Sequence, residues 1–186
     1  MLSIAIIDII GLTYDGSTLS KRGLGGSESA VILMAKELTE LGHDVTVFNN
    51  CIDREANPGR YDNVNYKDLS SLDTEQYTFD IIVSSRTVIP FITRELYERF
   101  AQYSPQRFSN IRSKFKVVWL HDTFCNGDEL LEPLLVSGNI DEVFTLSDFH
   151  TNYVTTCNHG NKRMFEVLKR KIFQTRNGIV TYKSEV

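Results

Sequence analysis

The stretch GLGGSESAVILMAKELTELGHDVTVF, residues 23–48, decides the fold class of this 186-residue chain. Four of its apolar residues recur at the i, i+3, i+4 and i+7 spacing of one helical face: Val31, Met34, Ala35 and Leu38. This spacing predicts a helix over residues 27–41, and Gly42 is the type of residue that ends such a helix. The β-rich run at 44–48 follows at once, so the stretch is typical of the helix and second strand of a βαβ unit.

The rest of the chain continues the same alternation. Apolar, β-rich runs predict strands at 3–10, 79–85, 115–120, 141–146 and 171–175. Helical patterns lie between them at 92–102, 128–136 and 147–156, and the polar stretch 53–63 is predicted to be a loop. We therefore expect an α/β fold with a Rossmann-like, doubly wound, mostly parallel sheet flanked by helices, in a single domain over residues 1–186.

The charge and composition of the chain exclude several classes of function. The net charge of −4 gives no general attraction to nucleic acid, and we expect no nucleic-acid partner. Five basic residues lie within 162–171, where a solvated face is a better explanation than peripheral contact with an anionic membrane. The apolar start contains Asp8, lacks a basic leader and is too short to span a bilayer, which predicts a cytoplasmic protein. The three cysteines show no metal-ligand spacing, so no metal site is expected.

The glycines at the start of the predicted helix are the first candidate site. Gly25 and Gly26 would let an anion approach the free backbone N–H groups and the positive end of the helix dipole. A tight loop-to-helix turn explains them equally well. The stretch is not a dinucleotide fingerprint, because Glu28 stands where the third glycine of G-x-G-x-x-G belongs, and the chain has no Gly-Lys-Ser/Thr of a P-loop.

Residues that follow strands are the other candidates, because ligands of open α/β sheets bind beyond the carboxyl ends of the strands. His121 follows the strand at 115–120, where an imidazole can hydrogen-bond a ligand hydroxyl or stabilise charge; the alternative is a structural hydrogen bond. Arg86 follows the strand at 79–85 and could pair with a phosphate or carboxylate, although a solvated loop arginine is the more ordinary case. Ser147 is predicted to cap the helix that follows it.

The order of these segments resembles a known family. GLGGSE at 23–28, AKELTELGHDVTVF at 35–48, LHD at 120–122, FTLSDFH at 144–150 and TRNGI at 175–179 are similar to the N-terminal domain of family 4 glycosyltransferases, one half of the GT-B fold. The resemblance covers residues 4–179. It implies a retaining transfer of a sugar from a nucleotide-sugar donor to a glycan or other hydroxyl acceptor, without a metal or other cofactor, in a cleft between two Rossmann-like domains.

The resemblance also implies roles for particular residues. Gly25 and Gly26 would lie near the donor diphosphate, and His121 would contact the donor sugar as the catalytic residue. The remaining candidate contacts to acceptor or donor are Arg86, Asp122, Lys21 and Arg22.

The sequence ends at Val186, before the donor-binding domain of that family, so we expect the chain's own C-terminal domain as a partner and no activity without it. The alternative is a non-catalytic α/β module that binds a nucleotide or another anion. The reading frame downstream of Val186 would separate the two hypotheses. An NAD-dependent reductase is disfavoured by the missing fingerprint.

Overall fold

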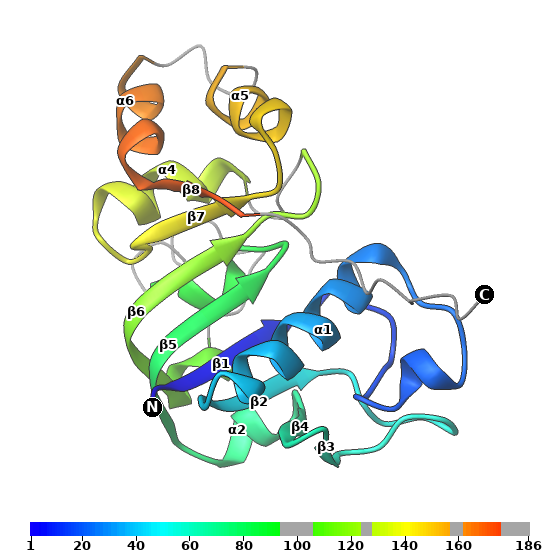
Figure 1. The fold of residues 1–186 in the computed structure, drawn as a ribbon. Helices are drawn as coiled ribbons and strands as arrows, with labels where there is room; N and C mark the ends of the chain where they lie inside the picture. Colours follow the sequence, from blue (N-terminus) through cyan, green and yellow to red (C-terminus); the bar gives the residue numbers. More distant parts are fainter. Residues whose placement is uncertain (94–105, 124–127, 157–161, 176–186) are drawn as a thin grey trace, which may run out of the picture.

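The computed structural model describes residues 1–93, 106–123, 128–156 and 162–175. These residues form an α/β fold around one twisted sheet of eight strands, flanked by helices (Figure 1). The strand order is β3-β4-β2-β1-β5-β6-β7-β8, and all neighbouring strands are parallel except the antiparallel pair β3 and β4. The predicted Rossmann-like, mostly parallel sheet is therefore confirmed.

The strands of the sheet are β1 Ser3–Asp8, β2 Asp44–Asn49, β3 Gly59–Tyr61, β4 Val64–Asp68, β5 Tyr77–Ser85, β6 Ile111–Trp119, β7 Glu142–Thr145 and β8 Ile172–Gln174. The described α-helices are α1 Gly26–Glu40, α2 Ser71–Thr74, α4 Asp128–Val136, α5 Asp148–Thr156 and α6 Lys162–Lys171. Short 3₁₀ turns occupy Thr18–Ser20, Ile89–Phe91 and Gln106–Asn110.

Most predicted elements lie where the hydrophobic pattern placed them. The helix predicted at 128–136 has the same bounds as α4, and Gly42 ends α1 with φ +89°. The first strand stops at Asp8 instead of continuing to residue 10, because the Asp8 carboxylate accepts a hydrogen bond from Gly11 N and starts a turn. The helix predicted at 92–102 lies outside the described residues from position 94 onward.

The sequence did not predict the β3–β4 hairpin: β3 and the turn lie in the stretch 53–63 that was predicted to be a loop, and β4 lies directly after it. β3 and β4 pair antiparallel across a tight turn at Asp62 and Asn63, which have φ values of 47° and 64°. Asp and Asn tolerate this left-handed backbone better than other residues with a Cβ, and such turns match the twist of a hairpin. The pair extends the parallel sheet by one antiparallel edge strand.

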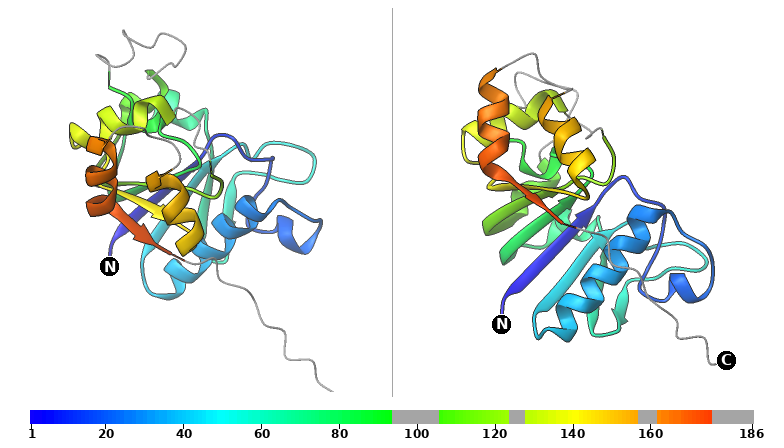
Figure 2. Two further views of the ribbon diagram at one scale, coloured as in Figure 1. Left: turned by 90° about the horizontal axis from the view of Figure 1, so that it is seen from above. Right: turned by 45° about the horizontal axis from the view of Figure 1, so that its top comes forward.

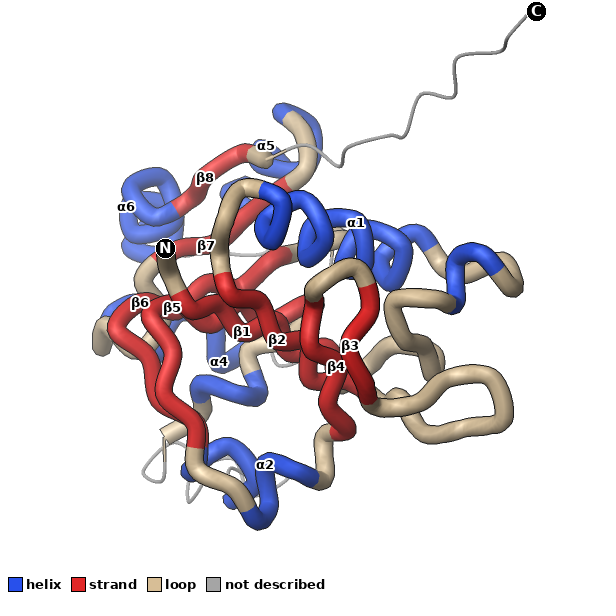
Figure 3. Tube along the Cα trace, turned by 60° about the horizontal axis from the view of Figure 1, so that its bottom comes forward, coloured by secondary structure: helices blue, strands red, loops and turns tan. Residues whose placement is uncertain are grey.

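Helices cover both faces of the sheet, and each face has its own core. Ile4 and Ile6 of β1 pack with Val31 and Ala35 of α1. Ala5 and Ile7 point the other way, into the cluster formed with α4, and Figure 3 shows α2 and α4 on the side of the sheet opposite α1. Right-handed crossovers explain this division, because the chain leaves β1 in one direction along the sheet and leaves β5 in the other.

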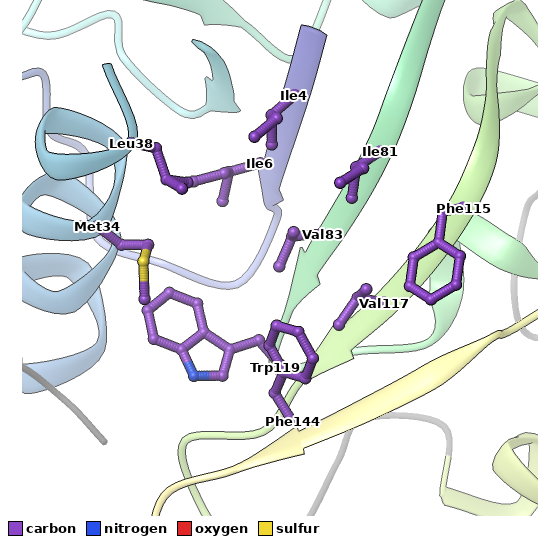
Figure 4. A pocket seen from close by; sticks show the side chains of 10 residues that line it. All are labelled: Ile4, Ile6, Met34, Leu38, Ile81, Val83, Phe115, Val117, Trp119 and Phe144. Atoms are coloured by element: carbon purple, nitrogen blue, oxygen red, sulfur yellow. The ribbon is translucent and has the colours of Figure 1, made fainter. Parts of the chain in front are cut away.

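The α1 side of the sheet is only partly covered. No described helix lies over β5 to β7 on this side (Figure 1 and Figure 2, right). A cavity of about 170 Å³ opens there, lined by apolar side chains of α1 and four strands, among them Met34, Trp119 and Phe144 (Figure 4). Phe115, at its edge, is 36% exposed. None of the described helices is long and apolar enough to cross a membrane.

Candidate functional site

The candidate site lies at the point where the strand order reverses. From β1 the chain continues to β2, which pairs on one side of β1, and β5 later pairs on the other side of β1. The connections therefore diverge at the carboxyl ends of β1 and β5, which is where open α/β sheets bind ligands. Asp8 ends β1, Arg86 follows β5, and His121 follows Trp119 at the end of β6 by two residues.

A buried group of three charged side chains occupies this point. One guanidinium nitrogen, Arg86 Nη2, donates to Asp8 Oδ1 at 2.9 Å and to Glu28 Oε1 at 3.2 Å. The exposed fractions of the three side chains are 14% for Arg86, 0% for Asp8 and 5% for Glu28. We call Asp8, Glu28 and Arg86 the switch-point cluster. With two carboxylates and one guanidinium, it carries a net negative charge when all three are ionised.

Neighbouring groups complete the hydrogen bonds of both carboxylates. The donors are Gly11 N at 3.2 Å and the Tyr14 hydroxyl at 3.0 Å to Asp8, and Leu12 N at 3.2 Å and Ser27 Oγ at 3.2 Å to Glu28. Burial opposes ionisation of Glu28, but hydrogen bonds from backbone N–H groups and the charge of Arg86 outweigh it and hold the Glu28 pKa below its ordinary value. Burial, and then the Asp8 charge, raise the pKa of Tyr14 well above its ordinary value, so Tyr14 remains a donor.

The backbone of Arg86 is strained, and its side chain is held by the two carboxylates. Its φ of 64° lies in the left-handed region, which is uncommon for a long side chain. Its N–H donates to Trp119 O at 2.9 Å and so ties the end of β5 to the end of β6. Its Nε is buried and has no hydrogen-bond partner among the described residues. Strain of this kind persists where surrounding contacts fix the residue, and it is concentrated at functional sites.

His121 lies next to this strained residue as an uncharged imidazole. Its ring centroid is 4.2 Å from that of Trp119, with the rings inclined at 47°. Burial first, and then the positive charge of Arg86, lower the His121 pKa to about 4. Both ring nitrogens are buried and have no partner within the described part of the chain. A neutral imidazole has one donor and one acceptor, and leaving both unpaired costs free energy, so the ring is suited to a ligand hydroxyl.

The two candidate glycines differ in what surrounds them. Gly25 is the N-cap residue of α1, and a Cβ on it would collide with the Glu28 carboxylate. The N-terminus of α1 is therefore already close to a carboxylate of its own helix. A Cβ added to Gly26 would meet no described atom within 4 Å beyond its chain neighbours and the nearby backbone of α1, so of these two glycines it is Gly26 that leaves open space beside the positive end of the helix.

The other candidate residues lie around the cluster without joining it. Lys21 Nζ donates to Glu55 O at 3.1 Å, and Arg22 Nε lies 3.4 Å from the Glu55 carboxylate. Both side chains therefore hold the loop after β1 against the loop after β2. Asp122 is exposed, directly after His121, and its charge acts on His150 of α5.

Sequence reasoning found Arg86 and His121 but did not identify the two carboxylates as site residues. Asp8 is a charged residue at the end of an otherwise apolar strand, and Glu28 directly follows the glycines and a serine. The signal at Asp8 was visible in the sequence, because a carboxylate among buried strand residues requires a partner. Their common partner, Arg86, is separated from Asp8 by 78 positions and could not be identified without the sheet order.

The described residues contain no group of three or more His, Cys, Asp or Glu side chains that could hold a metal ion. Comparison of the chain with protein families, curated proteins and solved structures found no match.

Proposed function

We propose that this chain is the N-terminal, acceptor-side domain of a retaining glycosyltransferase of family 4, which transfers a sugar from a nucleotide-sugar donor to a hydroxyl acceptor. The observation that carries the proposal is His121, an uncharged imidazole with both nitrogens unpaired by described groups, at the carboxyl edge of a doubly wound sheet. The order of sequence motifs around it supports the same function. The proposed enzyme is cytoplasmic and needs neither a metal nor nucleic acid.

Each group of the site has a role in this proposal. His121 hydrogen-bonds a hydroxyl of the donor sugar and helps to stabilise charge that develops during transfer. The open side of α1 at Gly26 faces the donor diphosphate, to which backbone N–H groups and the helix dipole contribute. The chain's own C-terminal domain supplies the main contacts to the nucleotide. Asp122, Lys21 and Arg22 remain candidate contacts at the rim.

Binding of nucleotides to the 186-residue chain is the first test. We expect UDP and GDP to bind with a dissociation constant of about 1 mM, because few backbone donors and one helix dipole are available. Chemical-shift changes in NMR spectra should include the amides of Gly26 and His121. Gly26→Val should weaken binding, whereas Gly23→Val, at a glycine that also has open space, should not. Micromolar binding of NAD⁺ would instead support a dinucleotide-binding protein.

Turnover is the second test. The isolated chain should fold but transfer no sugar, because both walls of a two-domain cleft must act on the transition state. In the enzyme with its donor-binding domain, His121→Ala should lower turnover at saturating donor about a hundredfold, or about 2.7 kcal/mol. His43→Ala, in the turn between α1 and β2, is the matched control and should keep normal turnover. Transfer by the isolated chain above a heat-killed control would refute the two-domain proposal.

A non-catalytic module for a nucleotide or another anion is the second candidate function. The open N-terminus of α1 at Gly26 favours it, because anion binding there requires no catalytic group. Such a module would bind UDP and inorganic diphosphate alike, and loss of His121 would leave that binding unchanged.

A further inference from the structure

We propose that Arg86, fixed by Asp8 and Glu28 at the end of β5, is a positioning residue that determines how His121 meets a ligand hydroxyl. The inference rests on the proposed function for the identity of the ligand, but its geometric basis is independent of it. Arg86 acts on His121 in two ways, one through the backbone and one through its charge.

The backbone connection passes through β6. Arg86 N donates to Trp119 O at 2.9 Å, and on the other side of the strand Leu120 N donates to Phe144 O at 2.9 Å. The residues immediately before His121 are thus held from both neighbouring strands. The Trp119 ring, only 1% exposed, packs against the imidazole and limits its rotation. Arg86 makes its part of this connection with a left-handed backbone, while its side chain is bonded to both carboxylates.

The charge of Arg86 acts on the protonation of His121. The ionisable groups around the imidazole come from three neighbouring elements: Arg86 after β5, Glu28 on α1 and His150 on α5. Asp8 lies on the far side of Arg86 as its second partner, and Asp122 follows His121 in the chain. Burial already disfavours the charged imidazole, and Arg86 disfavours it further, while Glu28 acts in the opposite direction.

The consequence is a specific hydrogen-bonding capacity. As a neutral ring, His121 can donate a hydrogen bond to one hydroxyl oxygen and accept a hydrogen bond from another group; as a cation it could only donate. Removing Arg86 would leave the Glu28 carboxylate without its cation, while the hydrogen bonds from Leu12 N and Ser27 Oγ remain. The negative charge of Glu28 would then act on the ring without the opposing charge of Arg86, which would favour the imidazolium and change how His121 meets its ligand.

The test is an NMR titration of the histidine ring resonances in the intact chain, with the His121 signal identified from its absence in His121→Asn. In the unchanged chain we expect no protonation of His121 down to about pH 5. In Arg86→Gln the ring should titrate at a higher pH than in the unchanged chain, because the cation that opposes its protonation is gone while Glu28 remains. Arg86→Lys, which keeps the charge, should behave like the unchanged chain. Lys114→Gln removes the cation of the exposed Lys114–Asp80 pair. It is the matched control and should leave the titration of His121 unchanged.

If Arg86→Gln does not fold, the double variant Glu28→Gln/Arg86→Gln leaves one carboxylate unpaired instead of two. This variant should still raise the pH at which His121 titrates, because Arg86 acts on the ring more strongly than Glu28. Unchanged titration in a folded Arg86→Gln or double variant, or an equal change in Arg86→Lys, would overturn the inference. The titration needs no sugar, so failure of nucleotide binding would refute the proposed function alone and leave the role of Arg86 standing.

Discussion

At the scale of single residues, the switch-point cluster depends on a glycine that touches it. A Cβ added to Gly11 would lie 2.5 Å from Asp8 Oδ2 and 3.1 Å from Arg86 Nη2. Because Asp8 is fully buried and bonded to Arg86, Tyr14 and Gly11 itself, its carboxylate has little room to retreat. The ion pair of Asp8 and Arg86 therefore requires a residue without a side chain at position 11.

We therefore predict that Gly11→Ala lowers the free energy of unfolding by about 1–3 kcal/mol, the usual cost of forcing an extra carbon into a packed site. Gly26→Ala is the control, because the added Cβ would meet nothing within 4 Å beyond its chain neighbours and the nearby backbone of α1, and it should be neutral or slightly stabilising in the first turn of that helix. Urea denaturation of both variants measures the difference. Equal stability of the two would show that the cluster adjusts to the added carbon.

The buried His121 also makes stability depend on pH. Its pKa is about 4 in the folded chain against 6.5 for the free side chain, so between these values the unfolded state binds the extra proton. The free energy of unfolding should therefore fall by about 2 kcal/mol as the pH decreases from 7 to 5, with His150 acting in the same direction. Urea denaturation at the two pH values should show this fall, and His121→Asn should remove most of it. The same pH dependence in His121→Asn would contradict the assignment.

At the scale of elements, α5 is positioned next to the site by its first turn. Ser147 Oγ accepts a hydrogen bond from His150 N at 3.1 Å, which confirms the predicted cap. His150 Nδ1 in turn accepts one from Leu146 N at 3.3 Å. The cap therefore fixes the helix that carries His150, one of the ionisable groups acting on His121.

Removing this cap should loosen α5. We predict that Ser147→Ala lowers the free energy of unfolding by about 1 kcal/mol, because His150 N loses its acceptor. Ser20→Ala, at an exposed serine whose hydroxyl bonds Ser17 O, should change stability by less than about 0.5 kcal/mol. Chemical denaturation gives both values. A change at position 147 no larger than at position 20 would mean that the cap contributes nothing measurable.

At the scale of the whole molecule, the doubly wound topology leaves one half of one face without a described helix. The described parts of the crossovers between β5 and β8 pack on the side of the sheet opposite α1. Among the described helices only α1 covers the other side, and it reaches only part of it (Figure 2). The apolar cavity beside α1 and the aromatic rings of Phe144 and Phe173, 5.6 Å apart, lie on this side. Phe173 is 58% exposed.

Such a surface should bind a hydrophobic dye in the native state. We predict that the folded chain enhances the fluorescence of ANS at neutral pH, and that Phe173→Asp reduces the enhancement. Phe149→Asp is the matched control, because Phe149 is 72% exposed on α5, lies beside the Tyr153 ring and does not line the cavity. Near-ultraviolet circular dichroism checks that both variants stay folded. An equal loss of dye binding in both variants would place the dye elsewhere.

The amino-acid sequence was sufficient to predict a mostly parallel sheet containing β1, β2 and β5 to β8, together with α1, α4 and the cap of α5. These follow from the period of apolar residues and from local chemistry at helix ends. The sequence also placed Arg86 and His121 after strands. It could not identify the β3–β4 hairpin, where two polar residues make the turn, nor the edge at which β8 pairs.

The site itself depends on the three-dimensional arrangement of the strands. The ion pair of Arg86 with Asp8 and Glu28 joins residues 78 and 58 positions apart, and it exists because β1 and β5 are neighbours in the sheet. The same packing buries the imidazole of His121 beside Trp119 and lowers its pKa. Local sequence specifies which way each side chain faces along its own strand or helix. The charge and packing at His121 come from Arg86 after β5, Glu28 on α1, Trp119 on β6 and His150 on α5, and these elements meet only once the chain has folded.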